Sequence, residues 1–203
     1  MKTYLTIVRH AQTVANQKRL FAGKMEVDVS EEGYRQIASL EKRLSQEKFD
    51  VVYSSPNIRA VQTVAGIAQK QGLPLIIDEN LQEMGYGEME GLPREELPLR
   101  YPEAYAFFEK YDYFSLLPGQ EELEDALKRY EACLRQIAND NLGKHVLIAT
   151  HGQILRGFLC QLTNTPFPES EQMKNTAVNE LEYDSETQQF HIISQNDTSH
   201  YSI

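Results

Sequence analysis

The sequence contains no tryptophan, only two cysteines and no long apolar run. A bilayer span needs roughly 18 consecutive apolar residues, and no stretch of this chain approaches that length, so no membrane segment is expected. The apolar stretch 4–8 is interrupted at once by Arg9 and has no small-residue cleavage site, so it lacks the form of a secretion signal. These absences predict a cytoplasmic protein.

The cysteines, Cys133 and Cys160, form no CxxC motif and have no second ligand nearby. Both fall in stretches whose pattern is typical of helix faces. A cytoplasmic location disfavours a structural disulfide. We therefore expect two buried free thiols.

Basic residues are in the minority, with 20 Lys and Arg against 30 Asp and Glu, which gives a net charge of −10. No block of lysines or arginines interrupts this balance. A nucleic-acid backbone would be repelled by the average surface, so nucleic-acid binding is not expected. A length of 203 residues with 41% hydrophobic residues suits one well-buried core, and we expect a single domain over 1–203.

Strand-like and helix-like segments alternate along the chain. Strands are expected at 3–8, 51–53, 75–77 and 146–150, and helices after Ser30, from the Ser55–Pro56 pair through 67, at 123–137 and at 153–162. This alternation predicts an α/β fold with a largely parallel sheet. Two final strands, 177–183 and 190–194, are joined by a turn at 185–187, and a hairpin there would make the sheet mixed. The proline-punctuated segment 85–119, with a helical aromatic middle around 101–111, is expected to be an elaboration on the domain.

Three of the expected strands end in residues of related chemistry. The first ends in Arg9 and His10, the second leads into a helix that carries Arg59, and the fourth ends in Thr150 followed by His151 and Gly152. Ligands of open α/β sheets bind beyond the carboxyl ends of the strands. Guanidinium groups and helix N-termini both favour phosphate oxygens, so this edge is predicted to be a phosphate site.

The histidines in such a site suggest covalent catalysis. Neighbouring positive charge should disfavour the imidazolium form of His10, which keeps a nitrogen lone pair available for attack on phosphorus. A leaving alkoxide also needs a proton, and Glu83, just after the third strand, is the best-placed carboxylic acid. A phosphate dianion would raise its pKa and the arginines would lower it.

Two other interpretations use the same residues. Two histidines and a carboxylate can form a metal triad, but two adjacent arginines oppose a divalent cation and the chain has no HxxxH or HxH pair, so neither a metal nor another cofactor is expected. A module that binds a phosphoanion without turnover is the second alternative. Such a module would not need both His10 and Glu83.

The motifs together resemble the histidine phosphatase superfamily, which includes cofactor-dependent phosphoglycerate mutases and many small-molecule phosphatases. The resemblance rests on IVRHAQT at 7–13, YSSP at 53–56, LQE at 81–83, GEMEG at 87–91 and THG at 150–152, and covers nearly the whole chain. It implies a three-layer α/β/α sandwich with a mixed, mostly parallel sheet, and activity without a metal. It also implies that His10 is the phosphorylated nucleophile, that Glu83 is the proton donor, that Arg9, Arg59 and His151 clamp the phosphoryl group, and that Asn16 and Gly152 contribute to binding.

The chain departs from the family pattern at four places, one of which is 119–121, where Gly-Gln-Glu replaces a common Gly-Glu-Ser. Ala11 replaces a glycine, Ala22 replaces a common phosphate-facing glutamine, and Met89 replaces an aromatic residue. None of these changes removes a proposed catalytic group.

The family also leaves open whether the enzyme is a phosphatase or a mutase. A mutase must grip a second phosphate, yet 88–101 contains only Arg94 and Arg100 as basic residues beside four glutamates. Hydrolysis of a small phosphorylated metabolite is therefore favoured over mutase activity. The aromatic residues of 101–114 are expected either to form a wall of the site or to pack the elaboration onto the sheet.

Overall fold

The computed structural model describes residues 1–202 and contains one six-stranded sheet with the order β3-β2-β4-β1-β5-β6. The strands are β1 (Lys2–Arg9), β2 (Val51–Ser54), β3 (Leu75–Ile77), β4 (His145–Thr150), β5 (Val178–Asp184) and β6 (Gln189–Asp197). The first four are parallel, and β5 runs antiparallel to both β1 and β6. The expected mixed sheet with a terminal hairpin is confirmed.

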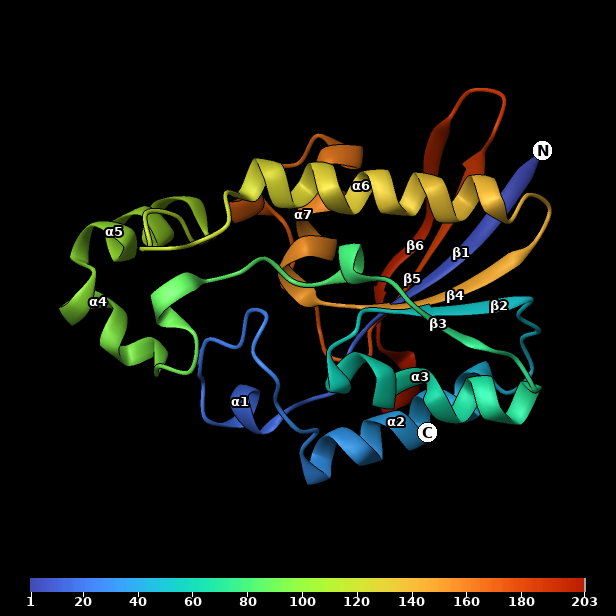
Figure 1. Cartoon of the computed structure of the whole chain (residues 1–203), viewed down its shortest axis with the longest axis horizontal. Coiled ribbons are helices and arrows are strands. Elements are labelled where there is room, and N and C mark those ends of the chain that lie inside the picture. Colours follow the sequence, from blue (N-terminus) through green and yellow to red (C-terminus); the bar gives the residue numbers. More distant parts are fainter. Residues whose placement is uncertain (203) are drawn as a thin grey trace.

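Helices cover both faces of this sheet (Figure 1). The helices α2 (Glu31–Leu44) and α3 (Ile58–Gln71) lie on one face, and α6 (Leu123–Asp140) and α7 (Gly152–Thr163) lie on the other. The arrangement is the predicted three-layer α/β/α sandwich. No helix within residues 1–202 is long and apolar enough to cross a membrane.

Alternate residues of the central strands supply the two cores. Ile7 and its partner Ile148 belong to the cluster under α6 and α7, whereas Val8 and its partner Ala149 belong to the cluster under α2 and α3. All four side chains are completely buried. This two-residue period follows from the alternation of side chains across a strand, and it fixes the register of β1 against β4.

The carboxyl ends of β2, β4 and β1 lie side by side because these strands are neighbours in the sheet. Arg9 pairs with Thr150, and the next residue along, His10, donates its backbone N–H to the Thr150 carbonyl at 2.9 Å. On the other side of β4, Ser55 donates its N–H to the Ala149 carbonyl at 3.0 Å. The predicted convergence of these strand ends is confirmed.

The expected start of the helix after β2 is wrong by two residues. Ser55 is not the N-cap; Asn57 holds that position and α3 begins at Ile58. Ser55 Oγ instead lies 2.7 Å from His151 Nε2, while the Ile58 N–H donates to a Glu26 carboxylate oxygen at 2.9 Å. The helix end is thus completed by a loop distant in sequence, which local capping signals do not reveal.

The segment 85–119 contains only short helices: η2 (Gly87–Met89), η3 (Arg94–Glu96), α4 (Leu97–Arg100) and α5 (Pro102–Tyr111). They lie to one side of the sheet, beyond the strand ends, at the left of Figure 1. The buried residues Met89, Leu97 and Phe114 of this segment belong to the same apolar cluster as Ile7 and Ile148. Met89 is completely buried, so the departure at this position is one of packing.

The remaining elements are short. They are α1 (Val14–Gln17), η1 (Glu79–Leu81), η4 (Phe167–Glu169) and η5 (Ser199–Ser202), the last of which packs against α2. Cys133 and Cys160 are buried free thiols, as the sequence predicts.

Candidate active site

His10 directly follows β1, and its ring is held in one tautomer. Its Nδ1 lies 2.7 Å from the carbonyl oxygen of Ala11. A carbonyl oxygen only accepts hydrogen bonds, so Nδ1 carries the proton and Nε2 carries the lone pair. The φ angle of Ala11 is not positive, so the alanine in place of glycine causes no left-handed backbone strain at this position.

The surroundings of His10 keep its imidazole neutral. Its side chain is only 6% exposed, and burial lowers its pKa well below the usual value, with Arg59 and Arg9 adding to the effect. Only the Ala11 carbonyl opposes this shift. The sequence predicted the contribution of the arginines, whereas the larger contribution of burial comes from the tertiary structure.

Arg9 extends from the end of β1 toward the first turn of α7. One of its terminal nitrogens donates to the carbonyl oxygen of Met173, and its Nε is buried without a hydrogen-bond partner within residues 1–202. Burial lowers its pKa to about 10, which leaves it charged at neutral pH. An added Cβ at Gly152 would lie 2.9 Å from Arg9 Nε, so glycine permits this close approach.

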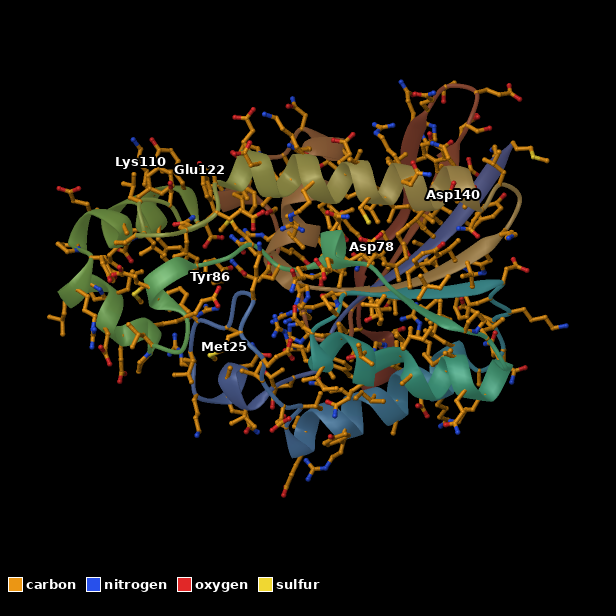
Figure 2. The ribbon with its side chains drawn as sticks, viewed as in Figure 1. Met25, Asp78, Tyr86, Lys110, Glu122 and Asp140 are labelled. Atoms are coloured by element: carbon orange, nitrogen blue, oxygen red, sulfur yellow. The ribbon has the colours of Figure 1, made fainter. Side chains whose placement is uncertain are left out.

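Arg59 lies in the first turn of α3 and is 1% exposed. Its terminal nitrogens donate to the carbonyl oxygens of Gly23 at 2.6 Å and Met25 at 2.7 Å, in the loop that follows α1. Figure 2 labels Met25 on this loop. Arg59 Nη2 also lies 3.1 Å from His151 Nδ1, so most of its donors already have protein partners.

His151 is completely buried behind His10, with 5.3 Å between the ring centroids. Because a guanidinium only donates, His151 Nδ1 accepts from Arg59, and the protonated Nε2 donates to Ser55 Oγ at 2.7 Å. Burial and the neighbouring Arg59 lower its pKa well below the usual value. His151 is therefore a neutral ring that packs against the site.

Glu83 follows η1 and lies against the N-terminus of α7. Its Oε2 accepts from Gln153 N at 2.8 Å, and its Oε1 accepts from Ile154 N at 2.9 Å and from Met84 N at 3.0 Å. These bonds and Arg59 favour the carboxylate, but burial outweighs them and raises the pKa of Glu83. The sequence did not reveal whether the pKa of Glu83 is raised or lowered. The structure shows that burial raises it, which favours the protonated form.

A cavity of about 130 Å³ lies at these strand ends. Six of the seven predicted site residues line it, namely Arg9, His10, Asn16, Arg59, Glu83 and Gly152. His151 is brought to the site but is not part of the cavity lining. Thr13 is the N-cap of α1 and exchanges a reciprocal pair of hydrogen bonds with Asn16, whose Oδ1 lies 3.4 Å from Asn175 Nδ2.

Several lining residues were not predicted individually from the sequence. Tyr86 lies three residues after Glu83, at the start of the segment 85–119, where Figure 2 labels it. Arg94 stacks over the rings of Phe21 and Phe114, with its guanidinium carbon 5.6 Å and 6.0 Å from their centroids. Arg94 has no ion-pair partner in the part of the chain that the structure describes. The available signal was that Arg94 is one of only two basic residues in the glutamate-rich stretch 88–101.

The aromatic residues of 101–114 divide between the two expected roles. The rings of Phe108 and Phe114 are stacked, with centroids 4.4 Å apart, and both residues line the cavity. Phe107, Tyr111 and Tyr113 instead contact one another away from the cavity lining. Phe108 and Phe114 therefore serve both roles, because Phe114 also belongs to the main apolar cluster and Phe108 packs against it.

The metal triad considered from sequence is not formed. Within residues 1–202, no group of three or more His, Cys, Asp or Glu side chains is arranged to hold a metal ion.

Comparison with known proteins decides the family. The profile of the histidine phosphatase superfamily (branch 1) matches residues 5–198. This chain belongs to that superfamily. The motifs that suggested it were therefore interpreted correctly.

Superfamily members similar to this chain include both phosphatases and mutases. A metal-independent phosphoserine phosphatase of Arabidopsis thaliana is 32% identical over 98% of this chain and 84% of its own length. A 2,3-bisphosphoglycerate-dependent phosphoglycerate mutase of Methylobacterium radiotolerans is 31% identical, over 80% of each chain. The solved structure of Bacillus stearothermophilus YhfR has a TM-score of 0.91 and 27% identity, with 98% of both chains covered. These findings confirm the fold class and support a phosphohydrolase for a small phosphorylated metabolite.

Proposed function

We propose that this protein is a phosphomonoester hydrolase in which His10 Nε2 attacks phosphorus. The observation that carries the proposal is the 2.7 Å contact between His10 Nδ1 and the Ala11 carbonyl, which leaves the Nε2 lone pair free in a cavity lined by three arginines. Attack forms a P–N bond and breaks the ester P–O bond, producing a phosphohistidine.

The phosphoryl oxygens would be held by groups that have donors to spare. Arg9 Nε is the clearest of these, because it is buried and lacks a protein partner within residues 1–202. The amide group of Asn16 and the backbone at Gly152, where α7 begins, line the same cavity. Arg59 supplies charge nearby and, with His151, fixes the loop and ring that surround the nucleophile.

Glu83 is proposed to move the proton in both half-reactions. Its protonated carboxyl donates to the leaving oxygen as the ester bond breaks. The resulting carboxylate then accepts a proton from the water that attacks the phosphohistidine, which releases phosphate and restores neutral His10. Burial, which raises the pKa of Glu83, supports the first of these roles.

We propose that residues 85–119 cap the site and that 1–203 is one domain. The support is that Phe108 and Phe114 line the cavity while Leu97 and Phe114 belong to the main apolar cluster. A small cavity with two aromatic walls suits a compact leaving group. We also propose a cytoplasmic location, which the two buried free thiols support.

We further propose that the leaving group carries a carboxylate. Arg94 lines the cavity without an ion-pair partner among the described residues, in a protein with a net charge of −10. Phosphoserine and phosphoglycerate, the compounds in the names of two relatives, both carry a carboxylate. A guanidinium stacked on aromatic rings is well suited to bind one.

The decisive experiment is release of phosphate from p-nitrophenyl phosphate in excess EDTA, combined with trapping of an acid-labile phosphoenzyme. We expect turnover and trapping in the wild type, and neither in His10→Ala. Binding of vanadate without any turnover would instead indicate a phosphoanion-binding module. Interconversion of 2- and 3-phosphoglycerate primed with the bisphosphate, faster than phosphate release, would indicate a mutase.

A further inference from the structure

The cavity carries a second carboxylate besides Glu83. Asp112, the C-cap residue of α5, lines the cavity together with Gln172. Its Oδ2 accepts from Gln172 Nε2 at 2.9 Å and from Arg156 Nη2 at 2.6 Å. The mechanism proposed above uses none of these three residues.

Arg156, on α7, holds Asp112 from behind. The Arg156 side chain is 2% exposed. Its Nη2, which binds Asp112, also lies 2.5 Å from the carbonyl oxygen of Phe167 and 2.9 Å from that of Ser170, and its Nε donates to the Ser170 hydroxyl at 2.9 Å. The Asp112 side chain is 31% exposed. In this ion pair the Arg156 guanidinium is buried in the protein, whereas the Asp112 carboxylate is partly accessible.

Two oxygen atoms of this cluster still have acceptor capacity. Asp112 Oδ1 accepts no hydrogen bond in the described part of the chain, because both bonds to the carboxylate go to Oδ2. Gln172 uses its Nε2 to reach Asp112, which leaves its Oε1 as an acceptor. A group with several N–H donors and a positive charge matches this pair of oxygens.

We propose that Asp112 and Gln172 form an ammonium subsite that selects substrates with a protonated amine on the leaving group. The inference rests on the proposed phosphatase function and narrows its substrate class. The cavity would then bind three groups at once: phosphate beside Arg9 and His10, a carboxylate at Arg94 and an amine at Asp112. The substrate class is a phosphorylated amino acid, and phosphorylated amino alcohols should bind the same subsite without using Arg94.

A matched pair of substrates isolates the amine. O-phosphoserine and 3-phosphoglycerate differ only in an ammonium group that replaces a hydroxyl group. We expect wild-type kcat/KM to be about tenfold or more higher for O-phosphoserine, because the Asp112 carboxylate binds a charged ammonium group more strongly than a neutral hydroxyl group. For the same reason, kcat/KM should be higher for phosphoethanolamine than for ethylene glycol monophosphate.

Variants then separate recognition from structural support. Asp112→Asn and Gln172→Met should each lower kcat/KM for O-phosphoserine about tenfold or more and leave 3-phosphoglycerate nearly unchanged. Glu103→Gln, which neutralises an exposed carboxylate in the first turn of the same helix, is the matched control and should change neither rate. An equal loss on both substrates would show that Asp112 only fastens α5 to α7, and would overturn the proposal.

Binding to His10→Ala tests the subsite without requiring catalysis. Calorimetry with this variant should show tighter binding of O-phosphoserine than of 3-phosphoglycerate, and equal affinity would contradict the ammonium subsite. If the wild type hydrolyses both compounds equally well, the phosphatase function stands and the subsite fails. If it hydrolyses no phosphomonoester while His10→Ala still prefers O-phosphoserine, the phosphatase function fails and the subsite stands.

Discussion

The carboxyl group of Glu83 lies against the start of α7, with its Oε2 2.8 Å from the backbone nitrogen of Gln153. This contact joins the proposed proton donor to the helix whose first residue, Gly152, makes room for Arg9. The helix N-terminus favours the carboxylate, while burial favours the protonated form and prevails. A group held between these two influences can both donate and accept a proton during one catalytic cycle.

Replacement of Glu83 by glutamine tests its role as proton donor. The amide keeps most of the size and part of the hydrogen bonding to α7 but cannot release a proton. We expect kcat for alkyl phosphates to fall about 10²–10⁴-fold, and the loss to be much smaller for p-nitrophenyl phosphate, whose leaving group needs no proton. An equal loss on both classes of substrate would argue against proton donation.

The pH profile follows from the directions of two pKa shifts. His10 must be neutral to attack, and its pKa is well below the usual value. Activity should therefore be lost only at a pH below the pKa of an ordinary histidine. Glu83 must be protonated, and its pKa is raised, so activity should fall as pH rises through that raised value. The profile of kcat/KM for an alkyl phosphate should therefore be bell-shaped, and Glu83→Gln assayed with p-nitrophenyl phosphate should lose the alkaline limb.

Gly152→Ala tests the close approach of Arg9 to α7. The added methyl group would lie 2.9 Å from Arg9 Nε and 3.2 Å from Arg9 Cδ, so the guanidinium must move away from the phosphate position. We expect kcat/KM to fall about tenfold or more, as for the loss of one charged hydrogen bond, with little change in thermal stability. Gly85→Ala is the control, because the nearest atoms to its added Cβ lie at an ordinary 3.7 Å. Comparable losses in both variants would contradict this explanation.

Arg94→Met tests the proposed carboxylate partner. Methionine retains contact with the rings of Phe21 and Phe114 but removes the charge. We expect KM for O-phosphoserine and 3-phosphoglycerate to rise about tenfold, while KM for phosphoethanolamine, which lacks a carboxylate, stays nearly constant. Arg100→Met provides a control on an exposed arginine of the same segment, which pairs with Glu96 at 2.5 Å. A uniform rise in KM for all three substrates would indicate only a general effect of charge.

The sequence by itself was sufficient for the fold class and the superfamily, and it placed the proposed nucleophile at a strand end. Apolar strands and amphipathic helices alternate along the chain. Arg9 ends the first strand, and His10 and His151 directly follow strands. Neighbouring parallel strands bring their carboxyl ends to one edge, so residues far apart in sequence could be placed together. The family motifs, which cover nearly the whole chain, then identified the superfamily.

The start of α3 could not be predicted from the local sequence. A serine followed by proline is a common helix start, but Ser55 contacts His151, and Glu26 receives the first N–H of the helix. Both partners come from other parts of the chain. Local preferences are outweighed when a distant residue satisfies the same backbone group.

Only the tertiary structure decided the surroundings of each proposed site residue. Burial, which no sequence pattern measures, lowers the pKa of His10 and raises that of Glu83. Packing of 85–119 against the strand ends places Arg94 and Asp112 at a cavity that their sequence positions did not predict. Patterns of neighbouring residues determine which elements form and which of their ends meet, whereas desolvation and long-range contacts depend on all the elements at once and arise only when the chain is folded.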